Sequence, residues 1–324
     1  MTSLRIVFLL PVFAAAALCP GLVSGQTYPE KPVRVVIPWP PGGSNDIVGR
    51  IIAQQVSASL GQSLIIDNRG GAAGTIGSDF VAKSPPDGYT MLITSATHLG
   101  NAHLYSKLPY DPLKDFIGVS PLGRQVGILA VHPSLPVRSV KEFVALAKRR
   151  PGEIVYGSAG NGSFTHLMMV LFNTMTGTRM LHVPYKGGAP AGISIDTGET
   201  QAMIATLGSF LPQLQAKRVR PLGVTSSTRV EQFPDIPTIA EAGVPGYEFV
   251  SWVGAFVPAG TPRNIVDRLN AEFRKANGDP GVRSRLTAAA HDSMYLSADQ
   301  FAQLLKADYA KYGKLIRMTG AKID

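Results

Sequence analysis

Hydrophobic residues along this chain follow two alternating patterns, short continuous apolar runs and longer stretches with a helical period. The short runs are rich in Val and Ile and are typical of strands buried on both faces of a parallel sheet. We expect such strands at Val33–Ile37, Leu64–Ile66, Thr90–Thr94, Ile128–Val131, Ile154–Tyr156, Met180–Val183, Gln201–Thr206 and Pro221–Thr225. The alternation with helices predicts an α/β fold with mainly parallel sheets.

The helical stretches place their apolar residues on one face, as amphipathic helices do. Ile52, Val56 and Leu60 share such a face, and the same spacing recurs at Leu167, Leu171 and Met175 and at Ile265, Leu269 and Phe273. Near the C-terminus, the segment from Ala298 to Met318 places Phe301, Leu305, Tyr309 and Tyr312 on one side. This pattern predicts a long helix that docks on the rest of the fold.

Two of the predicted strands run into loops rich in glycine and serine, and each loop opens a helix. The first loop contains Pro40-Pro-Gly-Gly-Ser-Asn45, and the second contains Gly157-Ser-Ala-Gly-Asn-Gly-Ser163. Free backbone N–H groups and the positive end of the helix dipole meet at such a point, which favours an anion. Neither loop has the Gly-Lys-Ser/Thr ending of a P-loop or the Gly-x-Gly-x-x-Gly pattern of a dinucleotide site. A tight connection would explain either loop alone, but two of them favour ligand binding.

The first residues have the pattern of a secretory signal peptide. Arg5 supplies the positive charge, Ile6 to Leu18 form the apolar stretch, and Val23-Ser-Gly25 supplies small residues before the expected cleavage. The apolar stretch is too short to span a bilayer. We therefore expect residues 1–26 to be removed and the protein to function in the periplasm. The only cysteine, Cys19, falls in this segment, so disulfides and cysteine-based metal sites are not expected.

About 298 residues then remain, enough for two domains with a well-buried core. The chain has 31 Lys and Arg residues against 22 Asp and Glu, a net charge of +9. No block of basic residues and no stripe of basic and aromatic residues supports nucleic-acid binding. A basic exported protein is compatible with an anionic ligand, whose approach the charge would speed.

The sequence gives little support to catalysis or to a metal. Ser158 lies in Tyr156-Gly-Ser-Ala-Gly160, which is offset from the Gly-x-Ser-x-Gly pattern of hydrolases. The six histidines include no metal-ligand spacing. His166, in the first turn after the second loop, is a candidate to brace that loop. We therefore expect no enzyme activity, no cofactor and no metal.

Two tryptophans remain to be placed. Trp39 precedes the first loop, where it suits a core aromatic and a pocket wall equally well. Trp252, within Tyr247–Ala255, is expected to pack near a crossing between two lobes.

These segments resemble the extracytoplasmic solute receptors of tripartite tricarboxylate transporters, also called Bug receptors. The resemblance spans the chain after the signal peptide. It rests on Tyr28–Asp46, Asp67–Gly77, Ala82–Tyr89, Leu108–Phe116, Tyr156–Ser163 with His166-Leu167, Val183–Gly187, Pro234–Thr238, Glu241–Tyr247 and Pro258–Pro262. No single segment is diagnostic, but their order and coverage make the match specific.

The resemblance implies a two-lobed periplasmic binding protein of type II, with crossing hinge strands between the lobes. Residues 27–126 with 250–324 would form the first lobe, and residues 127–249 the second. A small carboxylate would sit between the lobes, and inner-membrane transporter subunits would receive it from a monomeric receptor. The residues expected at the ligand are Trp39, Gly42, Gly43, Ser44, Asn45, Ser95, Thr97, Ser158, Gly160, Asn161, Gly162, Ser163 and Thr206.

One position departs from the family pattern, since Ser194 stands where the family usually has an aspartate nine residues after Tyr185. Two other functions remain open from the sequence. One is a sensor subunit of the same fold for a membrane histidine kinase, and the other is a periplasmic hydrolase.

Overall fold

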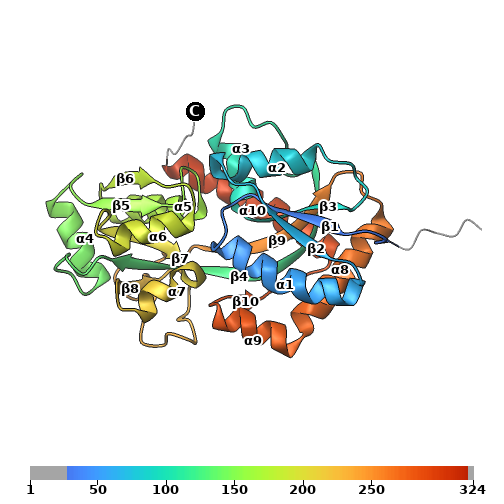
Figure 1. The fold of residues 1–324 in the computed structure, drawn as a ribbon. Coiled ribbons are helices and arrows are strands. Elements are labelled where there is room, and N and C mark those ends of the chain that lie inside the picture. Colours follow the sequence, from blue (N-terminus) through green and yellow to red (C-terminus); the bar gives the residue numbers. More distant parts are fainter. Residues whose placement is uncertain (1–27, 320–324) are drawn as a thin grey trace, which may run out of the picture.

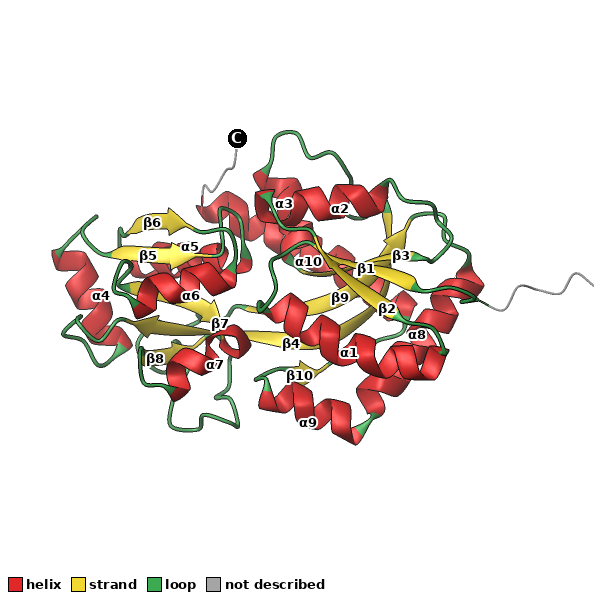
Figure 2. Cartoon of the chain, viewed as in Figure 1, coloured by secondary structure: helices red, strands yellow, loops and turns green. Residues whose placement is uncertain are grey.

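The computed structural model describes residues 28–319, so the predicted signal peptide and Cys19 lie outside the described residues. Within that range, strands and helices alternate along the chain as the sequence predicts (Figures 1 and 2). The strands are β1 Val33–Ile37, β2 Leu64–Asn68, β3 Thr90–Ser95, β4 Phe116–Val131, β5 Val155–Ser158, β6 Leu181–Pro184, β7 Ala202–Thr206, β8 Arg220–Val224, β9 Val250–Pro258 and β10 Asp292–Ser293. The α-helices are α1 Ser44–Leu60, α2 Thr75–Ala82, α3 Thr97–Leu104, α4 Val140–Arg149, α5 Phe164–Thr176, α6 Gly188–Asp196, α7 Leu207–Gln215, α8 Arg263–Gly278, α9 Pro280–Ala288 and α10 Ala298–Thr319.

The strands form two lobes that share the long strand β4 (Figure 1). In the first lobe β2, β1 and β3 are parallel, and β9 is antiparallel to both β3 and β4. In the second lobe β6, β5 and β7 are parallel, while β7 and β8 are antiparallel to β4. The predicted α/β architecture with two lobes is therefore confirmed, with mixed sheets that each contain three parallel strands.

Three strand assignments from the sequence are wrong in detail. Ile128–Val131 and Pro221–Thr225 were expected in parallel arrangement, but they lie in β4 and β8, which are antiparallel to each other. β4 enters the second lobe as a continuation of a first-lobe strand, so its direction is set by the crossing and not by a strand–helix–strand unit. Met180–Val183 was expected to be buried, yet β6 is an edge strand and Leu181 is exposed.

The crossing between the lobes is built from β4 and β9. The register of these strands ends at Val126 paired with Val250, and the next residue, Gly127, already pairs with Thr206 of β7. Trp252 lies in β9, where it is buried and donates from its Nε1 to Asp308 Oδ2 at 2.7 Å. Its predicted place near a crossing is confirmed, although the sequence did not predict β9 as a strand.

Helices cover the sheets on both faces, and α10 extends beside both lobes (Figure 1). The predicted C-terminal helix is confirmed, with Phe301, Leu305 and Tyr312 buried. The ring of Tyr312 packs edge-on against the ring of Phe249, which directly precedes β9, with ring centroids 5.9 Å apart. The C-terminal helix thereby packs beside the crossing strands.

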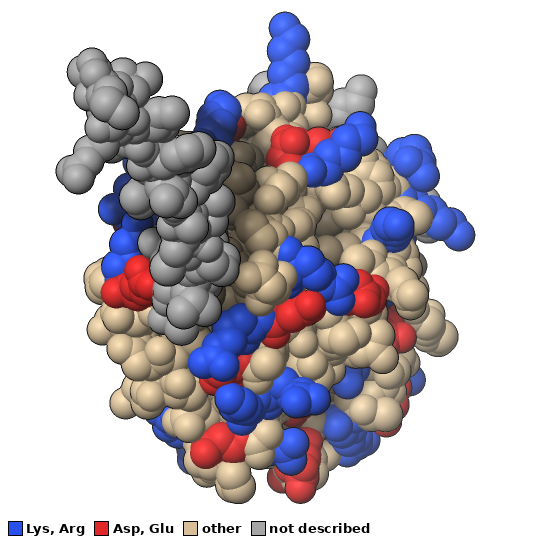
Figure 3. Space-filling view, turned by 90° about the vertical axis from the view of Figure 1, so that its right-hand side faces the viewer, with Lys and Arg blue, Asp and Glu red and all other residues tan. Residues whose placement is uncertain are grey.

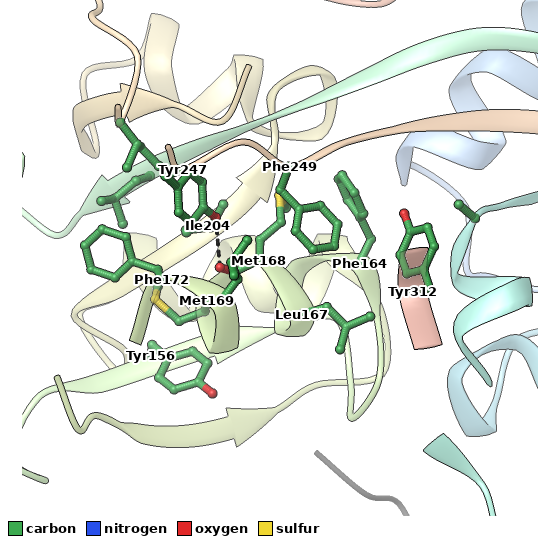
Figure 4. Close-up of a cluster of buried hydrophobic side chains, with 14 of the residues drawn as sticks. Tyr156, Phe164, Leu167, Met168, Met169, Phe172, Ile204, Tyr247, Phe249 and Tyr312 are labelled. Carbon is green, nitrogen blue, oxygen red and sulfur yellow. Dashed lines mark hydrogen bonds between the residues drawn. The ribbon is translucent and has the colours of Figure 1, made fainter. Parts of the chain in front are cut away.

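The second lobe has a dense core between α5 and the crossing segment (Figure 4). Tyr247 is buried there, and its hydroxyl donates to the Met168 carbonyl oxygen at 2.8 Å. Phe172 packs edge-on against Tyr247, and Phe164 packs edge-on against Phe249. This core fixes the position of α5, and with it the loop that precedes α5.

Candidate functional site

The first glycine loop joins β1 to α1 and is held by one buried carboxylate. The Gly42 N–H donates to Asp46 Oδ2 at 3.0 Å, which closes the loop onto the first turn of α1. Arg50 Nε and Asn68 Nδ2 also donate to Asp46. Burial alone would raise the pKa of Asp46, but the hydrogen bonds from Arg50, Gly42 and Asn68 together lower it below its usual value. Asp46 is therefore charged and positions the loop.

The second glycine loop joins β5 to α5 and is held by two uncharged histidines. The Gly162 N–H donates to His166 Nδ1 at 3.0 Å, so the expectation that His166 braces this loop is confirmed. The His166 ring stacks on the His182 ring at 4.1 Å, and His182 Nε2 lies 2.7 Å from Ser158 Oγ. Burial lowers the pKa of His166 to about 3, with a smaller effect of His182, and burial lowers the pKa of His182 to about 4.

A cavity of about 60 Å³ lies where the two loops meet. It is lined by Trp39, Pro40, Gly43, Ser44, Asn45, Ser95, Thr97, Gln125, Ala159, Ser163, Phe164, Thr165, Gly188, Thr206 and Ser209. The first turns of five helices contribute to this wall, namely α1, α3, α5, α6 and α7. No charged side chain of residues 28–319 belongs to the lining. The wall offers hydroxyl, amide and backbone groups at the positive ends of helix dipoles.

The amides at the start of α1 and α5 are available to a ligand. The first intrahelical bond of α1 is donated by Asp46, to the Gly43 carbonyl oxygen, which leaves the N–H groups before it without an acceptor in the helix. At α5 the cap is Ser163, whose Oγ accepts from the His166 N–H at 3.2 Å. Phe164 and Thr165, whose amides precede that bond in the helix, line the cavity.

The structure brings eight of the thirteen predicted site residues to the cavity wall. These are Trp39, Gly43, Ser44, Asn45, Ser95, Thr97, Ser163 and Thr206. Trp39 combines its two expected roles, since it packs against the core of the first lobe and also lines the cavity.

The other five predicted residues lie in the loops but not in the cavity wall. Gly42 gives its N–H to Asp46 and is exposed, and Asn161 is exposed as well. Ser158 is fully buried and accepts from the Gly160 N–H at 3.1 Å. Gly160 and Gly162 have positive φ angles of 125° and 73°, which glycine adopts without strain. These residues shape the loops.

Sequence reasoning missed seven lining residues, namely Pro40, Gln125, Ala159, Phe164, Thr165, Gly188 and Ser209. Pro40, Ala159, Phe164 and Thr165 adjoin predicted site residues in the two loops, so the loop pattern could have included them. Gly188 begins α6 and Ser209 lies in the first turn of α7, which makes them part of further helix N-termini. Gln125 lies in β4, and no local motif marks it.

Direct contacts join the two lobes around the cavity. Ser44 Oγ of α1 donates to Thr206 Oγ1 of the second lobe at 2.8 Å, in a buried position. Gly187 faces Pro40 so closely that a Cβ there would lie 2.8 Å from Pro40 Cγ. On another side, a methyl group at Gly208 would overlap the Ala289 carbonyl oxygen and lie 2.5 Å from His291 Nε2. The two lobes are therefore in direct contact in this structure.

The hydroxyl–imidazole contact beside the second glycine loop is not part of the cavity wall. The contact between Ser158 and His182 pairs a hydroxyl with an imidazole, but Ser158 is fully buried and lies outside the cavity. Within residues 28–319, no group of three or more His, Cys, Asp or Glu side chains could hold a metal ion. Over the same range, no helix has the length and apolar character needed to cross a membrane.

Surface charge gives no separate site on the face shown in Figure 3. Basic and acidic side chains are interspersed there. Ion pairs join several basic and acidic side chains of the structure, such as Arg263 with Asp267 and Asp299. This arrangement matches a solvated surface.

The lobes, the crossing strands and the cavity between two helix-opening loops define the fold of a periplasmic solute-binding protein. The model of the tripartite tricarboxylate transporter family receptor matches residues 48–321, and the chain belongs to this family. The resemblance found in the sequence is thereby confirmed. Members of this family are periplasmic solute-binding proteins and act as transporter receptors.

Relatives with known sequences or structures support the assignment to this family. BugT of Bordetella pertussis is 33% identical over 325 residues, and the alignment covers 100% of both chains. An R. palustris protein solved with adipate is 38% identical, with a TM-score of 0.89, over 91% of this chain and 100% of that one. MatC from Rhodopseudomonas palustris, solved with bound malate, is 30% identical, with a TM-score of 0.85, over 89% of this chain and 100% of that one.

Proposed function

We propose that this protein is a receptor that captures a small carboxylate in the cavity between its lobes and delivers it to a tripartite transporter. The observation that supports this most is the meeting of five helix N-termini at one cavity without a charged side chain among the described residues that line it. Each such terminus stabilises a negative charge by about 0.3–1 kcal/mol, and more in partly buried geometry. The adipate and malate in the related structures are carboxylates and agree with this chemistry.

The ligand carboxylate would be held by backbone and hydroxyl donors from both lobes. Gly43, Ser44 and Asn45 would contribute from α1, and Ser163, Phe164 and Thr165 from α5. Ser95, Thr97 and Thr206 would add hydroxyl groups, and Trp39 would form an apolar wall. Gly42, Ser158, Gly160, Asn161 and Gly162 would act indirectly, by setting the shape of the loops.

Binding would close the lobes around a hinge in the crossing strands. We place the hinge at Val126–Gly127 and at Phe249–Val250, which makes 27–126 with 250–324 one lobe and 127–249 the other. The change of strand partners between Val126 and Gly127 supports this division. A ligand that touches both loops would favour the closed form through contacts that an open form lacks.

The setting of this function would be the periplasm, reached through cleavage of residues 1–26. The receptor would work as a monomer and pass its ligand to inner-membrane transporter subunits, in line with its family. The periplasmic form should begin near Gln26 or Thr27. An intact mass that matches all 324 residues in a periplasmic extract would contradict the export proposal.

The binding proposal is tested by calorimetry with malate and adipate on a matched pair of variants. Gly43 has a φ of −81°, which suits proline, and the nearest atom to its Cβ position is the Pro40 carbonyl oxygen at 3.9 Å, so alanine fits there. Gly43→Ala keeps the N–H group and should retain affinity, whereas Gly43→Pro removes it and should weaken binding about ten-fold.

Two results would contradict the proposal. Equal affinities of the two variants would remove this loop from the site, and turnover of either acid would indicate an enzyme.

Ligand binding should also change the emission of Trp39, and this signal should disappear in Trp39→Phe but persist in Trp252→Phe.

A further inference from the structure

Gln125 stands apart in the cavity wall because it lies within a strand, away from the loops, strand ends and helix starts that supply the other lining residues. It lies in β4, beside the crossing, and is only 2% exposed. Its Nε2 donates to Asn45 Oδ1 of α1 at 3.2 Å, a contact that holds the amide against the first loop. Its Oε1 is buried and has no hydrogen-bond partner. A buried acceptor without a donor is costly, so Gln125 is prepared for a donor that arrives with the ligand.

The contact with Asn45 limits where this donor sits on the ligand. Asn45 belongs to the first turn of α1, where the ligand carboxylate is proposed to lie, and Gln125 Nε2 lies 3.2 Å from its Oδ1. Both residues line the same cavity. A donor that reaches Gln125 while the carboxylate occupies this helix start is therefore carried on the carbon beside the carboxylate.

The charge of the cavity wall selects the kind of donor. An ammonium group would need a carboxylate partner, because an unpaired buried charge is strongly unfavourable. Among residues 28–319, no Asp or Glu lines the cavity. A hydroxyl group supplies a donor without adding charge, so it fits the wall where an ammonium does not.

We propose that the ligand is a 2-hydroxycarboxylate and that Gln125 Oε1 accepts a hydrogen bond from its hydroxyl group. This rests on the proposed function, since it assumes that the carboxylate occupies the helix N-termini. Gln125 then determines specificity, because a ligand that lacks the hydroxyl leaves the buried oxygen unpaired. Sites that hydrogen-bond a ligand hydroxyl reject analogues without it far better than apolar pockets reject an added one.

Calorimetry on pairs of acids that differ by one hydroxyl tests this proposal. The pairs are lactate with propionate and malate with succinate, and alanine replaces lactate as the ammonium analogue. The native protein should bind at least one hydroxy acid about ten-fold more tightly than its deoxy partner. Alanine should bind more weakly than lactate.

Two variants separate recognition by Gln125 from a structural role. In Gln125→Met the new side chain has a similar length but no acceptor. This variant should therefore bind the two acids of a pair with about equal affinity. Gln125→Glu keeps an acceptor at the same place and adds a negative charge. It should weaken both acids of a pair but preserve their ratio, whereas Gln125→Met should abolish the ratio, and general damage to the fold would not produce this difference between the two variants.

The outcomes distinguish this inference from the proposed function. If no carboxylate binds the native protein, the proposed function fails and the inference fails with it. If both acids of each pair bind equally well, or if Gln125→Met keeps the preference, the receptor function stands and the assignment of Gln125 is wrong. The comparison of the native protein with the acid pairs decides the ligand class even if a variant fails to fold.

Discussion

The two loops that face the cavity share one backbone design but are held by different chemistry. Each follows a strand and opens a helix, and each uses a residue of that helix to fix a glycine N–H. In the first loop this residue is Asp46, a charged carboxylate that Arg50 and Asn68 also contact. In the second loop it is His166, an uncharged imidazole stacked on His182.

This difference shows that a site without charged groups in its wall can still depend on a charged side chain behind that wall, here Asp46. Asp46 binds solvent-accessible partners, since Arg50 is about half exposed. His166 and His182 stay neutral because burial lowers the pKa of each. The two halves of the site should therefore respond differently to acid and to substitution.

The largest effect is expected when the loops are kept apart. Gly208→Ala would place a methyl group against the Ala289 carbonyl oxygen of the other lobe, which is backbone and cannot easily move. With closure blocked, a ligand would contact one loop, and its affinity should fall about a hundred-fold. Gly278→Ala is the control, because its Cβ position is open. Small-angle scattering with ligand present should show a more open shape for Gly208→Ala, and an unchanged affinity would contradict the closure model.

Removal of the charged brace comes next. Asp46→Ala leaves the Gly42 N–H, Arg50 and Asn68 without their acceptor, and should lower the free energy of unfolding by about 2–3 kcal/mol. Asp46→Asn retains an acceptor for Gly42 and should lose about half as much. Denaturant unfolding measures both values, and equal losses would show that the charge rather than the hydrogen bond holds the loop.

Removal of the neutral brace should cost less. His166→Ala leaves the buried Gly162 N–H unpaired and should lower the free energy of unfolding by about 1–2 kcal/mol. His166→Asn offers an oxygen near the place of Nδ1 and should restore much of this loss. If asparagine rescues neither stability nor ligand affinity, the ring stacking rather than the hydrogen bond is what matters.

The smallest effect on stability is expected from a moderate fall in pH below neutral. This fall should destabilise the second loop before the first. Unfolded histidine binds a proton near pH 6.5, whereas the folded pKa values of His166 and His182 are about 3 and 4. Between these values the unfolded state binds more protons, so stability is full above about pH 6.5 and falls as the pH drops toward 4. The pKa of Asp46 is lowered, so its contribution is lost only below its usual pKa.

Thermal unfolding from pH 8 to pH 4 measures this slope. A His166→Gln/His182→Gln double variant should flatten it, because two of the residues that resist protonation are then absent. An unchanged slope would assign the acid sensitivity to other buried histidines, such as His98 and His291, whose pKa values burial lowers to about 3 and about 4.

Local sequence was sufficient to predict those parts of the protein that depend on neighbours in the chain. The apolar run Val33–Ile37 is a strand in the structure with the predicted bounds, and the helix expected from Ala298 to Met318 ends one residue later. Both glycine loops open helices, because glycine permits the tight turn after the strand and Gly and Ser are favoured at the N-cap of a helix. The anion-binding character that we propose for the loops rests on the same local geometry.

Contacts between distant segments were beyond the sequence. The antiparallel pairing of β8 with β4, and of β9 with β3 and β4, depends on how the chain crosses between the lobes, which no local pattern encodes. Gln125 reaches the cavity because β4 carries it beside Asn45, 80 residues away in the chain. The sequence by itself determined two anion-favouring loops, since dipoles and amides are properties of one strand–helix unit. Only the tertiary structure decided that five helix starts share one uncharged cavity, because that depends on packing between elements far apart in the chain.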